Sequence, residues 1–398
     1  MKKISRFEKI FVLGLVLSLF TLHYNQADTS LFLEKTSGKG HLRIQNGIPV
    51  LYLYGTPEEI GTQYGDILKS HVRVLMNEWL RPMYPEEKNW DKAIADAKAL
   101  EPLIPEAYRL EMRATARASG VVYEELLVAH TFTETSRMDW MFLCSGVIVY
   151  GDATADGTCY HGRNFDFPSR GLLTPRTLVI VYHPRGKIPF VSIGVPGIMG
   201  VVTGMNEKGI SLSTNYIIGK PKGNGIPMMF LYRMILEQSD SVEEAILNLK
   251  KATRSGANNL LLASEKQGVV CEYTKDDVIV RTAEKDLVYA TNHFRRIESP
   301  APCPRYAAIG RLVKAHYGDI GPAHMKTILQ ETALGGLNCQ AIILEPGEQT
   351  IHVAITDVNP AAHGPYRKLT SRDMFDVPPA APTEAPGSSQ PGLLPEPN

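Results

Sequence analysis

The sequence lacks the residue patterns that mark metal and nucleotide sites. None of its five cysteines stands in Cys-x-x-Cys spacing, so we expect no zinc site, and there is no glycine-rich nucleotide loop. Charge of one sign is not in excess either, because 42 Lys and Arg balance 42 Asp and Glu. Nothing in this balance favours a polyanionic partner. We therefore expect no metal, no cofactor and no nucleic acid.

Cysteine itself is scarce, and its odd number leaves at least one thiol unpaired in an exported chain. The chain has 398 residues, of which 44% are hydrophobic, enough for a large core that needs no disulfide bonds. We expect the cysteines to be mostly buried and unpaired. They are Cys144, Cys159, Cys271, Cys303 and Cys339.

The two ends of the chain differ in composition from its middle. Basic residues within the first nine positions precede an apolar run from 10 to 22, which is short for a membrane span of about 20 residues. The pattern predicts a signal peptide over 1–27, with an uncleaved N-terminal membrane anchor as the alternative, and hence an exported protein. The proline-rich stretch 376–398 predicts a disordered tail.

The segment 28–143 reads as mainly helical after an initial hairpin. Asn46-Gly47 predicts the turn of that hairpin, and Thr56 with Glu59 predicts a capping box at the first helix start. Apolar residues then recur at helical spacing. The predicted elements are the hairpin 41–54 and helices over 57–72, 90–100, 106–118 and 123–132.

Strands dominate from Cys144 onward, with a helical pair among them. Their clustering before and after that pair predicts an α+β domain over 144–375, which two sheets packed between helix layers would satisfy. Met205 to Gly209 predicts a turn. The predicted strands are 147–150, 159–164, 177–183, 189–193, 210–214, 260–263, 269–273, 278–281, 287–291, 340–344 and 351–355, and the helices are 228–237, 242–251, 304–315 and 323–330.

Cys144 has the clearest chemical context in the chain. Arg163 and Asp166 lie on the next predicted strand, which returns towards it. A cysteine attacks as the thiolate, so it needs a base or a positive environment. The base is either a distant histidine, as in papain-like proteases, or the cysteine's own α-amine, freed by backbone cleavage. The Gln and Trp context of papain-like proteases is missing, whereas reference pKa values of roughly 8 and 8.5 let amine and thiol exchange a proton readily.

Two further residues complete a candidate site. Asn292 ends a predicted strand and offers an amide donor of the kind found in oxyanion holes, and Arg305 opens the next helix. Plainer readings stay open: Cys144 as a core residue, Arg163 with Asp166 as a structural ion pair, and Asn292 as a turn cap. The arginines that compete with Arg305 are Arg295, Arg296 and Arg311.

These residues occur in an order typical of one enzyme family. The chain resembles the N-terminal nucleophile hydrolases of the penicillin acyltransferase type, and is similar to acid ceramidase, N-acylethanolamine acid amidase and choloylglycine hydrolases. The resemblance covers roughly residues 45 to 360 and implies a four-layer αββα sandwich, preceded by a pro-region over 28–143. It is carried by Cys144-Ser145, His161-Gly162-Arg163-Asn164-Phe165-Asp166, Thr291-Asn292-His293-Phe294 and Arg305.

The resemblance also implies self-cleavage between Leu143 and Cys144, after which Cys144 is the nucleophile and, through its new amine, the base. At two positions the chain departs from the family pattern, since Ser145 stands where Thr is frequent and Leu143 where Gly is frequent. The second departure bears on cleavage efficiency. The other implied roles are Arg163 beside the thiolate, Asp166 orienting the amine, Asn292 holding the oxyanion, Arg305 supporting the site by its charge, and Asn215 as a second oxyanion or amine contact.

The expected function is that of an exported, self-processing hydrolase, which cleaves a small N-acyl amide through an acyl-thioester on Cys144. Acyl transfer to an amine is one alternative, because only the acceptor differs, and an inactive secreted binding protein on the same fold is another. The N-terminal chain is expected to stay bound after cleavage. Its helices would either wall an apolar acyl pocket or only cover the sheet.

Overall fold

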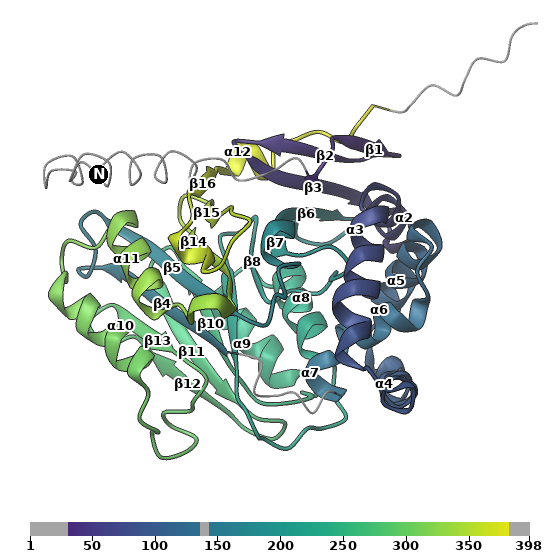
Figure 1. Ribbon diagram of the computed structural model, residues 1–398. Coiled ribbons are helices and arrows are strands. Elements are labelled where there is room, and N and C mark those ends of the chain that lie inside the picture. Colours follow the sequence, from purple (N-terminus) through teal and green to yellow (C-terminus); the bar gives the residue numbers. More distant parts are fainter. Residues whose placement is uncertain (1–30, 136–142, 382–398) are drawn as a thin grey trace, which may run out of the picture.

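The computed structural model describes residues 31–135 and 143–381 (Figure 1). Their strands form two sheets, one of ten strands and one of six. In spatial order the larger sheet contains β1 (Lys35–Ser37), β2 (Gly40–Gln45), β3 (Ile48–Gly55), β6 (Leu178–Pro184), β7 (Phe190–Gly194), β8 (Thr203–Asn206), β9 (Ser211–Tyr216), β10 (Asn258–Ser264), β11 (Gln267–Tyr273) and β12 (Val278–Thr282). The smaller contains β13 (Leu287–Ala290), β4 (Leu143–Gly151), β5 (Gly157–Asp166), β14 (Asn338–Glu345), β15 (Thr350–Ala354) and β16 (Tyr366–Leu369).

The helices fall into an N-terminal group and two pairs that cover the sheets. A π-helical stretch, Leu75–Leu80, continues α3. The N-terminal group is α2 (Pro57–Ile67), α3 (Lys69–Val74), α4 (Glu87–Leu100), α5 (Glu106–Ser119), α6 (Tyr123–His130) and α7 (Phe132–Thr135). The pairs are α8 (Met228–Gln238) with α9 (Val242–Lys251), and α10 (Pro304–Ala315) with α11 (Pro322–Thr332); a short α12 (Ser371–Met374) follows β16.

Alternation along the strands decides which layer each side chain packs against. On β3, Leu51 and Leu53 belong to the core beneath the helices, whereas Val50 and Tyr52 belong to the core between the sheets. The pair α8–α9 packs on the outer face of the larger sheet and α10–α11 on that of the smaller (Figure 1). The order helix, sheet, sheet, helix confirms the predicted α+β, αββα sandwich.

The segment before Cys144 is part of this sandwich as well as a cover for it. The predicted hairpin is confirmed as β2–β3, with Asn46 at φ 51° and Gly47 at φ 76°, the left-handed pair that a tight hairpin turn requires. The capping box of Thr56 and Glu59 is also present. Because β3 pairs in parallel with β6, the region predicted as mainly helical supplies three edge-side strands to the larger sheet.

Local differences from the predicted elements have local causes. Residues 203–206 form β8, so the turn predicted from Met205 begins later, at Glu207. The Asn206 side chain closes that turn, since its Oδ1 accepts from the backbone N–H of Lys208 (3.1 Å) and Ile210 (2.9 Å). The short edge strands β1 and β16 were not predicted, and the first helix divides at Leu68.

The structure describes only part of the two chain ends on which the predictions of a leader and a disordered tail rest. The leader 1–27 lies outside the described residues, as does the tail beyond residue 381. The described start of the tail packs on the first hairpin, where Tyr54 Oη donates to the carbonyl of Val377 (2.6 Å). Within 31–135 and 143–381, none of the helices has the length and apolar content to cross a bilayer. All five cysteines are unpaired and four are buried, as expected.

Candidate active site

Strand pairing brings the predicted nucleophile, cation and carboxylate together. β4 and β5 run antiparallel, with Cys144 opposite Phe165 and Leu143 opposite Asp166. Since side chains alternate, Cys144 and Arg163 face the larger sheet, where Arg163 meets β9. Asp166 faces the opposite layer and accepts from the chain just after α11. The cation and the carboxylate therefore flank the cysteine from the two faces of the smaller sheet.

Arg163 is a buried cation beside the sulfur. Arg163 is only 1% exposed. Its Nη2 donates to Cys144 Sγ (3.4 Å) and to the Thr214 carbonyl (3.3 Å). Its Nη1 donates to Thr203 Oγ1. Burial raises the pKa of the Cys144 thiol, the Arg163 guanidinium opposes that rise, and the Asp166 charge adds to it. A guanidinium here stabilises the thiolate over the thiol.

Asn292 holds the backbone nitrogen of Cys144. β13 lies next to β4, with Ala290 opposite Gly146, so Asn292 arrives beside the cysteine two residues later. Its Oδ1 accepts from the Cys144 N–H (2.8 Å), and its Nδ2 donates to the Tyr216 carbonyl (2.8 Å). A carbonyl oxygen only accepts, so these two bonds fix the orientation of the amide. The oxyanion role of Asn292 stays a prediction; the observed contact is to the nitrogen that cleavage would free.

Arg305 is the arginine that reaches the site. From the first turn of α10, its Nη1 donates to the Cys144 carbonyl (2.8 Å) and lies 3.4 Å from Asp166 Oδ2. Its Nη2 donates to Asn292 Oδ1 (2.9 Å). The competing Arg295 instead donates to the Ala301 carbonyl (2.9 Å) and stacks on an aromatic ring.

Asp166 is a carboxyl group whose environment favours the neutral form. Burial raises its pKa to about 6, against the opposing hydrogen bond from Asn338 and the charge of Arg305. Asn338 Nδ2 donates to Asp166 Oδ1 (2.8 Å), and the Leu334 N–H donates to the same oxygen (3.4 Å). Asn338 was missed in the sequence. Its one signal was a polar residue just before a predicted strand, which does not by itself distinguish it from a turn residue.

Asn215 is positioned differently from the other candidates. Its Nδ2 donates to the Ala290 carbonyl (2.9 Å), and its Oδ1 is buried with no hydrogen-bond partner among the described residues. A carboxamide oxygen accepts and does not donate. Contact of this oxygen with an amine therefore fits the orientation, and the oxyanion role stays a prediction, because the NH₂ group carries a second donor besides the one bonded to Ala290.

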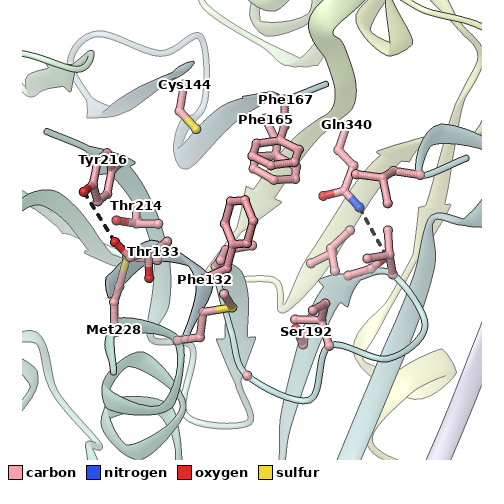
Figure 2. Close-up of a pocket in the computed structure, with 18 of the residues that line it drawn as sticks. Phe132, Thr133, Cys144, Phe165, Phe167, Ser192, Thr214, Tyr216, Met228 and Gln340 are labelled. Atoms are coloured by element: carbon pink, nitrogen blue, oxygen red, sulfur yellow. Dashed lines mark hydrogen bonds between the residues drawn. The ribbon is translucent and has the colours of Figure 1, made fainter. Parts of the chain in front are cut away.

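An apolar pocket begins at the sulfur (Figure 2). Cys144 and Arg163 are among its lining residues. Its wall includes residues from the segment before Cys144, so the N-terminal helices line the pocket in addition to covering the sheet. Those residues are Trp79, Ala129, Phe132 and Thr133.

Parts of the chain are similar to known proteins. Residues 153–317 match the family model described as acyl-coenzyme A:6-aminopenicillanic acid acyl-transferase. An uncharacterised protein of Archaeoglobus fulgidus is 27% identical over 273 residues, which are 59% of this chain and 45% of that protein. Acid ceramidase of Balaenoptera acutorostrata scammoni is 25% identical over 204 residues, 44% of this chain and 48% of the relative. The chain thus spans about half the length of these curated relatives.

Among solved structures, the Caenorhabditis elegans ortholog of N-acylethanolamine-hydrolyzing acid amidase is similar, with a TM-score of 0.44 and 18% identity. The similarity covers 51% of this chain and 93% of that one.

Proposed function

We propose that the chain is a member of the N-terminal nucleophile hydrolases of the penicillin acyltransferase type, whose family model matches residues 153–317, and that it is an exported cysteine amidase. It cuts its own backbone before Cys144 and then cleaves small N-acyl amides. The observation that carries the proposal is that three side chains hold three different atoms of Cys144. Asn292 bonds its nitrogen, Arg305 its carbonyl oxygen and Arg163 its sulfur. A cysteine that only fills a core needs none of these contacts.

Self-cleavage uses the bond between Leu143 and Cys144, which are the first two residues of β4. Sγ attacks the Leu143 carbonyl carbon, the C–N bond breaks, and the thiol proton passes to the departing nitrogen. Water then hydrolyses the resulting thioester, which gives the Leu143 carboxylate, the Cys144 thiol and a free α-amine. The Asn292 contact supports this step because it orients the scissile nitrogen (2.8 Å).

In the amidase reaction the new α-amine takes the thiol proton, and the thiolate attacks the acyl carbon of the substrate. The amine product leaves with that proton, and water hydrolyses the acyl-thioester. Arg163 stabilises the thiolate, Asn292 holds the α-amine, and Asp166 supplies the charge that orients it. The roles of Arg163 and Asn292 rest on the contacts described above, and the role of Asp166 rests on the family resemblance.

An apolar acyl group fits the pocket. Phe165, Phe167, Leu173 and Val195 line it together with the N-terminal helices, so a hydrocarbon chain attached to the reacting carbonyl loses its water contact on binding.

The N-terminal chain is proposed to remain bound after cleavage. Arg233 on α8 pairs bidentately with Glu111 on α5 (2.8 and 2.7 Å), and with Glu237 (2.8 Å). The side chains of Arg233 and Glu111 are each 2% exposed. This buried network joins one side of the proposed cut to the other, and β3 joins the same two segments through its pairing with β6.

Acyl transfer to an amine is the second candidate, since the same thioester precedes both outcomes. The inactive binding protein is less favoured, because the cysteine and its charged and amide neighbours are all present. Export rests on the basic and apolar leader of the sequence alone.

The test is intact-mass measurement and N-terminal sequencing of the purified protein, followed by assays on N-acyl amino acids, N-acyl amines and conjugated bile salts beside casein. We expect two chains, with the second beginning at Cys144, and turnover of small amides. Cys144→Ala should yield one chain without activity, and Cys144→Ser should cleave slowly. A single active chain, or casein cleavage without small-amide turnover, would overturn the proposal. Added amine acceptors distinguish transfer from hydrolysis.

A further inference from the structure

One polar group in the apolar pocket has an unused hydrogen-bond acceptor. Gln340 on β14 is 1% exposed and lines the same pocket as Cys144. Its Nε2 donates to the Gly194 carbonyl (3.2 Å) and to Thr177 Oγ1 (3.3 Å). Its Oε1 is buried and has no hydrogen-bond partner among the described residues.

The orientation of this amide is determined by its neighbours. The Gly194 carbonyl only accepts hydrogen bonds, so the nitrogen of Gln340 must face it. Rotating the amide by half a turn would set two oxygens against each other. Figure 2 shows the nitrogen bonded at the pocket wall and the oxygen directed inward, on the side of Phe132.

Gln340 also stands in register with the nucleophile. Cys144 pairs with Phe165 across β4 and β5, and Phe165 pairs with Gln340 across β5 and β14. Directly opposed residues share one face of a sheet, so the sulfur, the Phe165 ring and the Gln340 amide form one row on the pocket floor. Two strand spacings separate its ends, which amounts to roughly 10 Å.

We propose that Gln340 selects acyl groups that carry a hydroxyl in the distal half of the chain. A buried acceptor without a partner is unfavourable, and a hydroxyl donor at that depth removes the penalty while the rest of the chain stays in apolar surroundings. A plain hydrocarbon chain leaves the oxygen unpaired. The inference deepens the proposed function and rests on it for the identity of the pocket as the acyl site.

The experiment separates binding from turnover. Binding of decanoic acid and of its monohydroxylated isomers is measured by calorimetry on the Cys144→Ala protein, and hydrolysis of the matching decanoyl amides on the active protein. We expect the isomers hydroxylated in the distal half to be favoured about tenfold, the effect of one hydrogen bond. Isomers hydroxylated next to the carboxyl group should show no such preference.

Two variants connect the preference to Gln340. In Gln340→Leu, the ratio of hydroxylated to plain ligand, in binding and in turnover, should fall to about one or below. Gln340→Met replaces this variant if leucine impairs folding. Val195→Ala, a change in the apolar wall of the same pocket, should leave the ratio unchanged. The assignment would be overturned if all isomers bound equally to the Cys144→Ala protein that retains Gln340. An unaltered ratio in both Gln340 variants would also overturn it. Selective binding of hydroxylated acids without turnover of any amide would support the role of Gln340 and refute the amidase proposal.

Discussion

The ionisation of Asp166 should lower the unfolding free energy of the protein as the pH rises. The carboxyl group is buried beside Arg305 and Asn338, and its pKa is raised from 3.8 to about 6, mainly by burial. Well below pH 3.8 the group is neutral in both the folded and the unfolded chain. Between the two pKa values the unfolded chain releases this proton before the folded protein does, so ionisation favours unfolding and the contribution is lost through pH 6.

The size of the effect follows from the difference between the two pKa values. A change from 3.8 to about 6 corresponds to about 3 kcal/mol of unfolding free energy, at roughly 1.4 kcal/mol for each pKa unit. Asp166→Asn removes the titration. The unfolding free energy of the variant, relative to its parent, should therefore rise by about 2.5 kcal/mol between pH 4 and pH 8, because a small part of the change already occurs below pH 4. The absolute difference also contains the altered contact with Arg305, which does not titrate in this range.

The assay is urea unfolding followed by tryptophan fluorescence, in the Cys144→Ala background so that the chain stays in one piece. Asp373→Asn is the matched control, because hydrogen bonds lower the pKa of Asp373 despite partial burial. Because this lowered pKa and the ordinary value of 3.8 both lie below pH 4, its loss should leave the difference nearly flat from pH 4 to pH 8. An Asp166→Asn difference that stays flat from pH 4 to pH 8 would refute the reasoning, since it would mean that this carboxyl group titrates alike in both states.

Three further predictions follow from contacts at and beyond the site. Asn292→Ala should lower kcat by about 10²–10³ if Asn292 is the oxyanion donor that the family resemblance implies; an unchanged kcat would leave Asn292 its contact to the Cys144 nitrogen but no oxyanion role. Arg163→Met should move the ionisation of the Cys144 thiol to higher pH, since it removes the positive charge that lowers this pKa, and a pH–rate profile identical to wild type would contradict it. Arg233→Met should cost about 3–5 kcal/mol of stability because it strands buried carboxylates, whereas Arg113→Met, which breaks a surface pair with Glu101, should cost at most about 1 kcal/mol in the same urea titration.

Features that depend on neighbouring residues were predictable from the sequence. The Asn46-Gly47 turn requires left-handed backbone, and Thr56 with Glu59 closes its capping box within one helical turn. Both signals act over a few residues, so no knowledge of the remaining fold was needed. The order of Cys144, Arg163 and Asp166 was readable for a similar reason, because they lie on adjacent antiparallel strands.

Features that depend on distant pairing were not predictable in this way. The parallel contact of β3 with β6 joins segments more than a hundred residues apart, and no local pattern in either strand indicates the partner. Asn338 and Gln340 acquire their significance from register, since β14 aligns them with Asp166 and Phe165. Arg305, by contrast, could be named from the sequence, because it opens the helix predicted over 304–315.

The parallel pairing of β3 with β6 has a consequence for the order of folding and cleavage. A cut at Leu143 would divide the ten-stranded sheet between two polypeptides, with β1 to β3 on one and the remaining strands on the other. In the uncut chain β3 and β6 belong to one polypeptide, which keeps them at high effective concentration while they pair. After a cut they would have to find each other as two separate chains. Folding must therefore come before the cut. A matured protein, once fully unfolded and diluted, should regain activity poorly, while the uncut Cys144→Ala protein should recover its native fluorescence.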